Sequence, residues 1–151
     1  MTIEPVSSIK EVAALLAENA LPIADISDTS PPQFFGIRDG GALVAVVGLE
    51  LHQPFGLLRS LAVRSSCRKR GLGRELVSFA ESWSAAHGVA SLFLLTTTAE
   101  QFFLRLGYLR ASRDHAPSVI QETSQFSCLC PASSAFLAKH LSDPTPAKAM
   151  P

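Results

Sequence analysis

Three consecutive elements between residues 57 and 95 constrain the fold most strongly. Residues 57–64 are mostly apolar and suit a strand in the middle of a sheet. From Gly71 to His87, apolar residues recur at three- and four-residue steps, as in an amphipathic helix, and Gly88 can end that helix in a left-handed conformation. Residues 90–95 read as a second buried strand. A strand, helix and strand in this order predict helices packed on a sheet.

The rest of the chain agrees with this fold class. The further expected elements are a strand at 2–6, a helix that starts at a capping box of Ser8 and Glu11, strands at 33–38 and 42–52, a helix at 99–106, a strand from Tyr108, a helical turn at 117–123 and a strand at 135–141. Residues 21–32 are expected to form a loop near an acceptor site. Together the elements predict one α/β (α+β) domain with a mixed sheet over residues 1–142, followed by a disordered tail at 143–151.

Composition limits the partners. The chain has 13 Lys and Arg residues against 13 Asp and Glu residues, so it lacks the basic excess of a protein that binds nucleic acid. Its apolar runs, such as 42–49, are much shorter than the roughly 20 residues of a membrane-spanning helix, and the N-terminus has no leader pattern. We therefore expect a soluble cytoplasmic protein that contacts neither nucleic acid nor membrane.

The three cysteines fit a reducing compartment. Cys67, Cys128 and Cys130 make an odd number without a disulfide-framework spacing. In an extended chain, Cys128 and Cys130 would place two thiols on one side, where a soft metal or metalloid could reach both. The alternative is that they are small apolar residues. We expect no bound metal.

A basic, glycine-containing segment precedes the long helix. A helix start exposes backbone N–H groups and the positive end of the helix dipole, glycines permit close approach of a ligand, and arginines add charged donors. Neither a Walker loop nor a Gly-x-Gly-x-x-Gly fingerprint is present. The alternative is a solvated basic turn. The candidate residues for binding an anion such as a pyrophosphate are Arg68, Lys69, Arg70, Gly71, Leu72, Gly73 and Arg74.

Two motifs resemble the GNAT acetyltransferases. They are Leu61-Ala62-Val63 followed by Arg68-x-x-Gly71-x-Gly73, and the segment 99–108, and the resemblance spans roughly residues 2–141. It implies the GNAT fold, a mixed central sheet with splayed central strands flanked by helices, and acetyl-CoA as co-substrate. Residues 68–74 would hold its pyrophosphate, and the strand at 61–63 would bind the pantetheine arm as an added strand. Backbone N–H groups near Ala62 and Val63 would stabilise the oxyanion.

A finer resemblance concerns the acceptor. Residues 57–63, 94–103 and 126–134 resemble the ArsN-type acetyltransferases of arsenic resistance, in particular their second subtype. A weaker similarity connects the chain to the acetyltransferase domain of N-acetylglutamate synthase. Both imply transfer of acetyl to the amine of a small amino-acid-like acceptor, either glutamate-like or arsenic-bearing. Dimers are common among such proteins, so a homodimer is a further expectation.

Polar side chains near the strand ends are candidates for the acceptor site. Arg59 could clamp a carboxylate, with Ser60 and the hydroxyls of Thr96, Thr97 and Thr98 as further donors. The alternatives are a solvent-facing Arg59 in an exposed ion pair and threonines that only favour strand structure. Glu50, with His52 on the same strand face, is the candidate base, and the alternative is an exposed strand glutamate.

Two positions depart from the GNAT pattern. Phe103 stands where many members have a tyrosine that protonates the thiolate, and Leu57 stands where some have a carboxylate. Tyr108 is expected in the core. Catalysis would then depend mainly on positioning and backbone electrostatics. Two other functions remain open: acetylation of a peptide or protein amine, and a CoA-binding or thiol-based arsenic-sensing protein without turnover.

Overall fold

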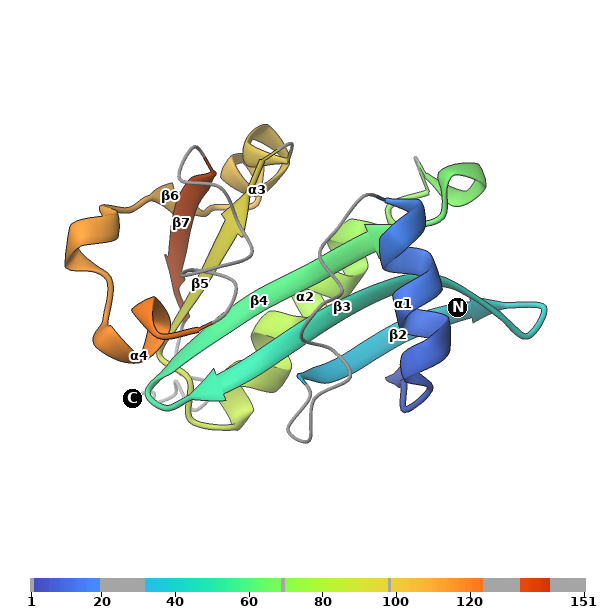
Figure 1. The fold of residues 1–151 in the computed structure, drawn as a ribbon, viewed down its shortest axis with the longest axis horizontal. Helices are drawn as coiled ribbons and strands as arrows, with labels where there is room; N and C mark the ends of the chain where they lie inside the picture. The colour runs from blue at the N-terminus through green and yellow to red at the C-terminus, as the bar shows by residue number, and fades with distance from the viewer. Residues whose placement is uncertain (1, 20–31, 69, 98, 124–133, 142–151) are drawn as a thin grey trace, which may run out of the picture. The chain divides into compact units, whose positions relative to one another are not determined.

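The computed structural model describes residues 2–19, 32–68, 70–97, 99–123 and 134–141 (Figure 1). Seven strands form one mixed sheet in the order β1-β2-β3-β4-β5-β7-β6, which confirms the predicted α/β class. The elements in chain order are β1 (Ile3–Pro5), α1 (Ile9–Glu18), β2 (Gln33–Asp39), β3 (Ala42–His52), β4 (Phe55–Val63), the 3₁₀ turn η1 (Ser65–Cys67), α2 (Leu72–Ala86), β5 (Ser91–Thr96), α3 (Glu100–Arg105), β6 (Leu109–Arg110), the 3₁₀ turn η2 (Arg113–His115), α4 (Ser118–Gln121) and β7 (Ala135–His140).

The elements belong to two compact units. The first contains Met1–Glu50 and Leu58–Ala80, and the second contains Leu51–Leu57 and Glu81–Pro151, so β4 and α2 each contribute residues to both. The expectation of a single domain over residues 1–142 stays a prediction. The expected tail at 143–151 lies outside the described residues.

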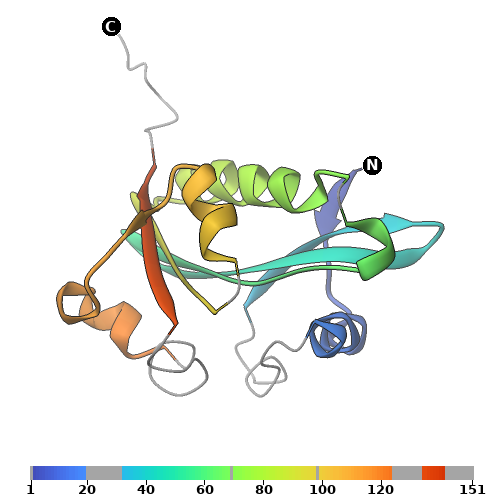
Figure 2. The same cartoon turned by 90° about the horizontal axis from the view of Figure 1, so that it is seen from above.

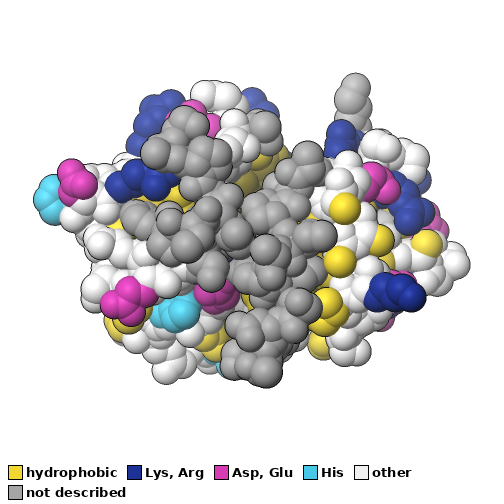
Figure 3. All heavy atoms as spheres, viewed as in Figure 1, with side chains coloured by type: hydrophobic (Ala, Val, Ile, Leu, Met, Phe, Trp, Pro, Cys, Tyr) yellow, Lys and Arg dark blue, Asp and Glu magenta, His cyan; other side chains and the backbone are white. Residues whose placement is uncertain are grey.

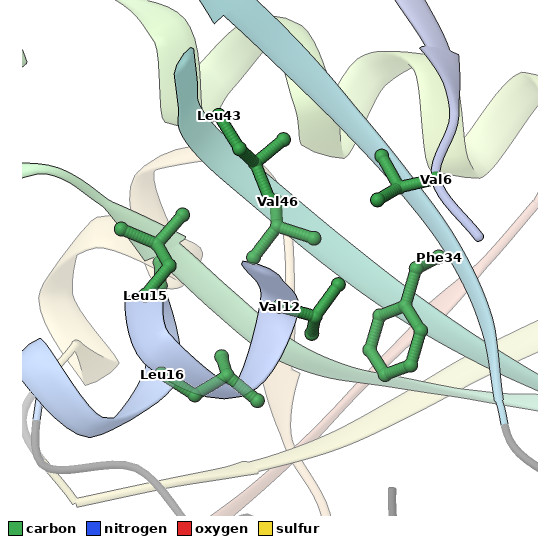
Figure 4. Close-up of a cluster of buried hydrophobic side chains, with 8 residues drawn as sticks. Val6, Val12, Leu15, Leu16, Phe34, Leu43 and Val46 are labelled. Carbon is green, nitrogen blue, oxygen red and sulfur yellow. The ribbon is translucent and has the colours of Figure 1, made fainter. Parts of the chain in front are cut away.

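In the first unit, α1 packs on one face of the strands. Ser8 caps the helix, with its hydroxyl accepting a hydrogen bond from the Glu11 amide at 3.3 Å, as the capping box predicts. The buried face of α1 meets β2 and β3 around Phe34 and Val46 (Figure 4). Figure 2 shows α1 and the start of α2 on opposite faces of these strands. On the α2 face, the Phe35 and Phe79 ring centroids are 4.9 Å apart.

An ion pair connects β2 to α1 at the edge of this core. Arg38 donates from Nη1 and Nη2 to the two carboxylate oxygens of Glu11, at 2.8 and 2.7 Å. The hydrogen bond from Arg38 lowers the pKa of Glu11 below its usual value. The contact therefore favours the ionised carboxylate and links the helix to the strand.

The second unit is built around β5. Residues Phe55, Gly56 and Leu57 of β4 pair in parallel with residues 91–93, and β5 also pairs with β7 in antiparallel register. The Phe93 and Phe136 rings stack with centroids 5.5 Å apart, and Ile120 of α4 is fully buried in the same cluster. β6 pairs with β7 through only two residues. The predicted strand after Tyr108 is thus short.

Charges of both signs are mixed on one face of the molecule. On the face shown in Figure 3, described basic side chains lie next to acidic ones. This agrees with the equal numbers of basic and acidic residues in the sequence. Among the described helices, none has the length and apolar character needed to cross a membrane.

Candidate functional site

The turn before α2 is built on Gly71. Its φ of +77° is accessible to glycine at little cost, and its carbonyl accepts a hydrogen bond from the Glu75 amide at 3.1 Å, which closes the first turn of the helix. A Cβ added at Gly71 would meet no atom of the described residues within 4 Å. The predicted helix start is confirmed, and no described residue covers the Cβ position of Gly71 in front of α2.

Apolar side chains fix how α2 begins. Leu72 and Leu76 are buried and anchor one side of the first turn, whereas Arg74 is exposed. The first amides of a helix have no acceptor within the helix, so those of residues 72–74 can bind a ligand. The positive end of the helix dipole lies at the same place. The described residues therefore fit a phosphate group at this turn.

The arginines of the loop have different surroundings. Arg68 donates from Nε to the Val63 carbonyl at 3.3 Å and from Nη2 to Asn19 Oδ1 at 2.6 Å. Arg70 lies 3.6 Å from an Asp39 carboxylate oxygen, and both side chains are about half exposed. Arg68 is therefore held by the protein itself. Arg70 forms only a loose surface pair, which contributes little to stability.

Two other basic residues are candidates for direct phosphate contact. Arg74 is exposed and Arg64 is half-buried, and within the described ranges neither is found in an ion pair. Arg64, four residues before Arg68, was not identified from the sequence. Lys69 lies outside the described residues.

The strand β4 changes its backbone conformation at Ser60. This residue has φ +58°, the one positive value among the non-glycine residues that the structure describes. After it, Ala62 is buried in the core of the first unit, and Leu61 and Val63 are half-buried. The described ladder between β4 and β5 ends at the pair Leu57 and Phe93. No glycine marks Ser60 in the sequence, so this irregularity was not predicted.

Arg59 is a buried cation paired with Glu50. Its residue exposure is 3%, and Nη1 lies 3.0 Å from Glu50 Oε2. Its Nε donates to Ser60 Oγ at 3.0 Å. The alternative of a solvent-facing arginine is therefore wrong, and the two predicted acceptor-site residues of β4 are brought together with the predicted base.

Gly48 makes room for this arginine. A Cβ at Gly48 would lie 2.9 Å from Phe34 Cε1 and 3.3 Å from Arg59 Cγ. The lack of a side chain on β3 thus allows the aliphatic part of Arg59 to pack against the strand. The role of Gly48 was not predicted from the sequence. A glycine two residues before a glutamate in an apolar strand was the available signal.

The threonines belong to the second unit. Thr96 Oγ1 accepts a hydrogen bond from the Ala99 amide at 2.9 Å, so this hydroxyl supports the turn into α3. Thr97 is exposed. Thr98 lies outside the described residues. The suggested donor role of these hydroxyls stays a prediction.

The second unit also contains Phe103 and Tyr108. Phe103 is buried and meets the Tyr108 ring edge-on, with centroids 5.5 Å apart. The Tyr108 hydroxyl donates to Glu81 Oε2 at 3.0 Å, and Lys139 Nζ lies 3.1 Å from the other oxygen of Glu81. Burial, with Glu81 as a smaller cause, raises the pKa of Tyr108 far above its usual range. Tyr108 is fully buried, as predicted.

Of the cysteines, Cys67 is a buried free thiol in η1. Cys128 and Cys130 lie outside the described residues, and their suggested role stays a prediction. Over the part of the chain that the structure describes, no group of three or more His, Cys, Asp or Glu side chains is placed to hold a metal ion.

Comparison with known proteins gives a family match. The profile of the Acetyltransferase (GNAT) family matches residues 7–108. An uncharacterized N-acetyltransferase of Chlorobaculum tepidum is 40% identical over 63 residues, which are 42% of this chain and 40% of that protein. The amino-acid acetyltransferase of Ectopseudomonas mendocina is 28% identical over 122 residues, 78% of this chain and 28% of that protein. The chain thus spans well under half of these relatives.

Solved structures share the fold. N-acetylglutamate synthase from Neisseria gonorrhoeae, complexed with coenzyme A and N-acetyl-glutamate, superposes with a TM-score of 0.75 at 21% identity, covering 93% of this chain and 35% of that one. Tetrahymena GCN5 gives a TM-score of 0.76 at 11% identity, covering 95% and 98%. Because the family profile matches more than half of the chain and the fold agrees, the protein belongs to the GNAT family of acetyltransferases.

Proposed function

We propose that the protein is an acetyl-CoA-dependent N-acetyltransferase whose acceptor is a small amino-acid-like compound with a carboxylate. The open, left-handed turn at Gly71 in front of α2 carries the proposal, because it offers backbone donors to the diphosphate of coenzyme A. Family membership and the fold shared with coenzyme A complexes support the same co-substrate.

The residues that would hold the co-substrate lie in the first unit. The amides of residues 72–74 face the diphosphate in this proposal, and the exposed Arg74 adds a charged donor. Beyond Leu57, where the described ladder with β5 ends, β4 would offer backbone groups to the pantetheine arm. The amides near Ala62 and Val63 would then lie along the acyl group.

Arg59 supports the choice of a carboxylate acceptor. A guanidinium binds a carboxylate through two parallel hydrogen bonds, and a buried one does so with little competition from water. Arg59 is buried beside Ser60, and its partner Glu50 shows that this environment already holds a carboxylate. The similarity to amino-acid acetyltransferases is consistent with this acceptor class.

The reaction requires the acceptor amine to attack the thioester carbonyl carbon. A C–N bond forms, the C–S bond breaks, and the amine loses one proton. Glu50 is the proposed base, and its ion pair with Arg59 at 3.0 Å fixes the direction of its carboxylate. Phe103 has no proton to give, and the Tyr108 hydroxyl is buried against Glu81. Water therefore carries the proton from Glu50 to the leaving thiolate in this proposal, which gives the free thiol and regenerates the base.

The test is release of free coenzyme A thiol from acetyl-CoA with a panel of acceptors. The panel pairs amino acids with their α-amides and includes glutamate and an arsenic-bearing amino acid. We expect turnover with at least one amino acid and a much higher KM for its amide. Tight acetyl-CoA binding without turnover on any acceptor would instead favour the non-catalytic CoA-binding alternative. Preference for peptide amines would contradict the acceptor class.

A further inference from the structure

The residue that ends α1 holds an arginine of the cofactor loop. Asn19 follows the helix, and its Nδ2 donates to the Leu15 carbonyl at 3.0 Å. The same side-chain amide accepts from Arg68 Nη2 through Oδ1 at 2.6 Å. Because the nitrogen is occupied by the helix carbonyl, the oxygen points to Arg68. The two residues are 49 positions apart in the sequence and belong to the same unit.

Arg68 is tied to β4 as well. Its Nε donates to the carbonyl of Val63, the last residue of β4, at 3.3 Å. Arg68 also ends η1, with its amide 3.5 Å from the Ser65 carbonyl. The guanidinium thus connects the end of a helix to the end of a strand, at a position three residues before Gly71 in the sequence.

The electrostatics of α1 favour this contact. The last turn of α1 contains no basic residue, although the C-terminal end of a helix carries partial negative charge. Arg68 supplies the missing cation from a distant part of the sequence. The interaction is charge-assisted and short, so it restrains a side chain that would otherwise be mobile at an exposed position.

We propose that Asn19 is a positioning residue for the cofactor turn. Through Arg68, it fixes the end of η1 against the end of β4, and so sets where the amides of residues 72–74 are presented to the diphosphate. Arg68 therefore acts through the loop backbone, and direct phosphate contact comes from other groups. This role rests on the proposed use of acetyl-CoA.

The experiment measures coenzyme A affinity by calorimetry in the full chain for the parent, Asn19→Ala, Arg68→Gln and the double variant. We expect each single variant to bind about 10-fold more weakly, as for loss of a charged hydrogen bond. The double variant should bind no more weakly than Arg68→Gln alone, because both substitutions remove the same hydrogen bond between Asn19 and Arg68. Asn19→Asp keeps the acceptor oxygen and should bind within about twofold of the parent.

The matched control is Ser8→Ala at the other end of the same helix. It removes the cap on the Glu11 amide and should lower the melting temperature without weakening coenzyme A binding. If Asn19→Ala does not fold, Arg68→Lys, which keeps the charge at an exposed position but cannot make both bonds, takes its place and should bind about 10-fold more weakly.

Three results would overturn the positioning role of Asn19 and leave the proposed function standing. They are parent-like coenzyme A affinity in folded Asn19→Ala or Arg68→Lys, additive losses of affinity in the double variant, or an equal loss of affinity in Ser8→Ala. Failure of the parent to bind coenzyme A would instead refute the proposed function, and the positioning role with it.

Discussion

Replacing Gly71 with aspartate tests the diphosphate assignment directly. In the free protein the Cβ of the new side chain meets no atom of the described residues within 4 Å, so the main cost is the positive φ of +77°, about 1 kcal/mol for a residue other than glycine. With coenzyme A bound, a carboxylate about 5 Å from a phosphate is repelled by about 3 kcal/mol at an effective dielectric constant of about 20. Gly71 is exposed, and screening by solvent leaves about half of that.

The expected result is coenzyme A binding at least about 10-fold weaker, since 1.4 kcal/mol corresponds to about a tenfold change. The melting temperature should fall by only about 2–4 °C. Gly40→Asp is the matched control, because Gly40 also has positive φ, +62°, and no described neighbour of its Cβ position within 4 Å. It should lose similar stability and keep its affinity. Titration calorimetry that gives folded Gly71→Asp the same Kd as the parent would refute the assignment.

Three other predictions concern single side chains. Arg59→Gln should raise the KM for a carboxylate acceptor about 10-fold while leaving the Kd of acetyl-CoA unchanged, and an unchanged KM would remove Arg59 from the acceptor site. Tyr108 is the sole tyrosine of the chain, so its tyrosinate absorbance can be followed alone. Because the pKa of Tyr108 is raised in the folded chain, its contribution to stability is fully present below the pKa of an unfolded tyrosine, about 10, and is lost as the pH rises above that. Ionisation of Tyr108 should therefore accompany unfolding. Reversible ionisation near pH 10 in the folded chain would contradict this. The lowered pKa of Glu11 has the opposite sign: its contribution is present above about pH 4.3 and is lost as pH falls below it. Thermal melts of Glu11→Gln should therefore depend less on acid pH than those of the parent, and identical acid dependence would show that the Arg38 contact contributes nothing.

The sequence predicted what depends on local periodicity and on glycine. The apolar repeat of α2 and the left-handed conformation of Gly88 after it are local properties, and both were found where expected. Contacts between distant segments were harder to foresee. The 2.6 Å bond between Asn19 and Arg68 depends on where α1 ends relative to β4, and no local pattern of the sequence encodes that arrangement.

In the acceptor region, too, individual residues could be predicted from the sequence, but the contacts between them could not. Arg59 and Glu50 were identified separately by their chemistry, but their pairing at 3.0 Å depends on the register of β3 and β4. The burial of Arg59 depends in addition on Gly48, whose missing side chain leaves the space. Ser60 adopts its positive φ without glycine, so the sequence carried no sign of it.

Ser60 combines two properties that substitution can separate. Its backbone holds a conformation that glycine adopts freely, and its hydroxyl accepts a hydrogen bond from Arg59 at 3.0 Å. A glycine at this position would preserve the path of the main chain and give up the oxygen, whereas an alanine would keep the strain and lose the oxygen as well. Comparing these two replacements would divide the contribution of strand shape from that of side-chain chemistry at a single point of β4.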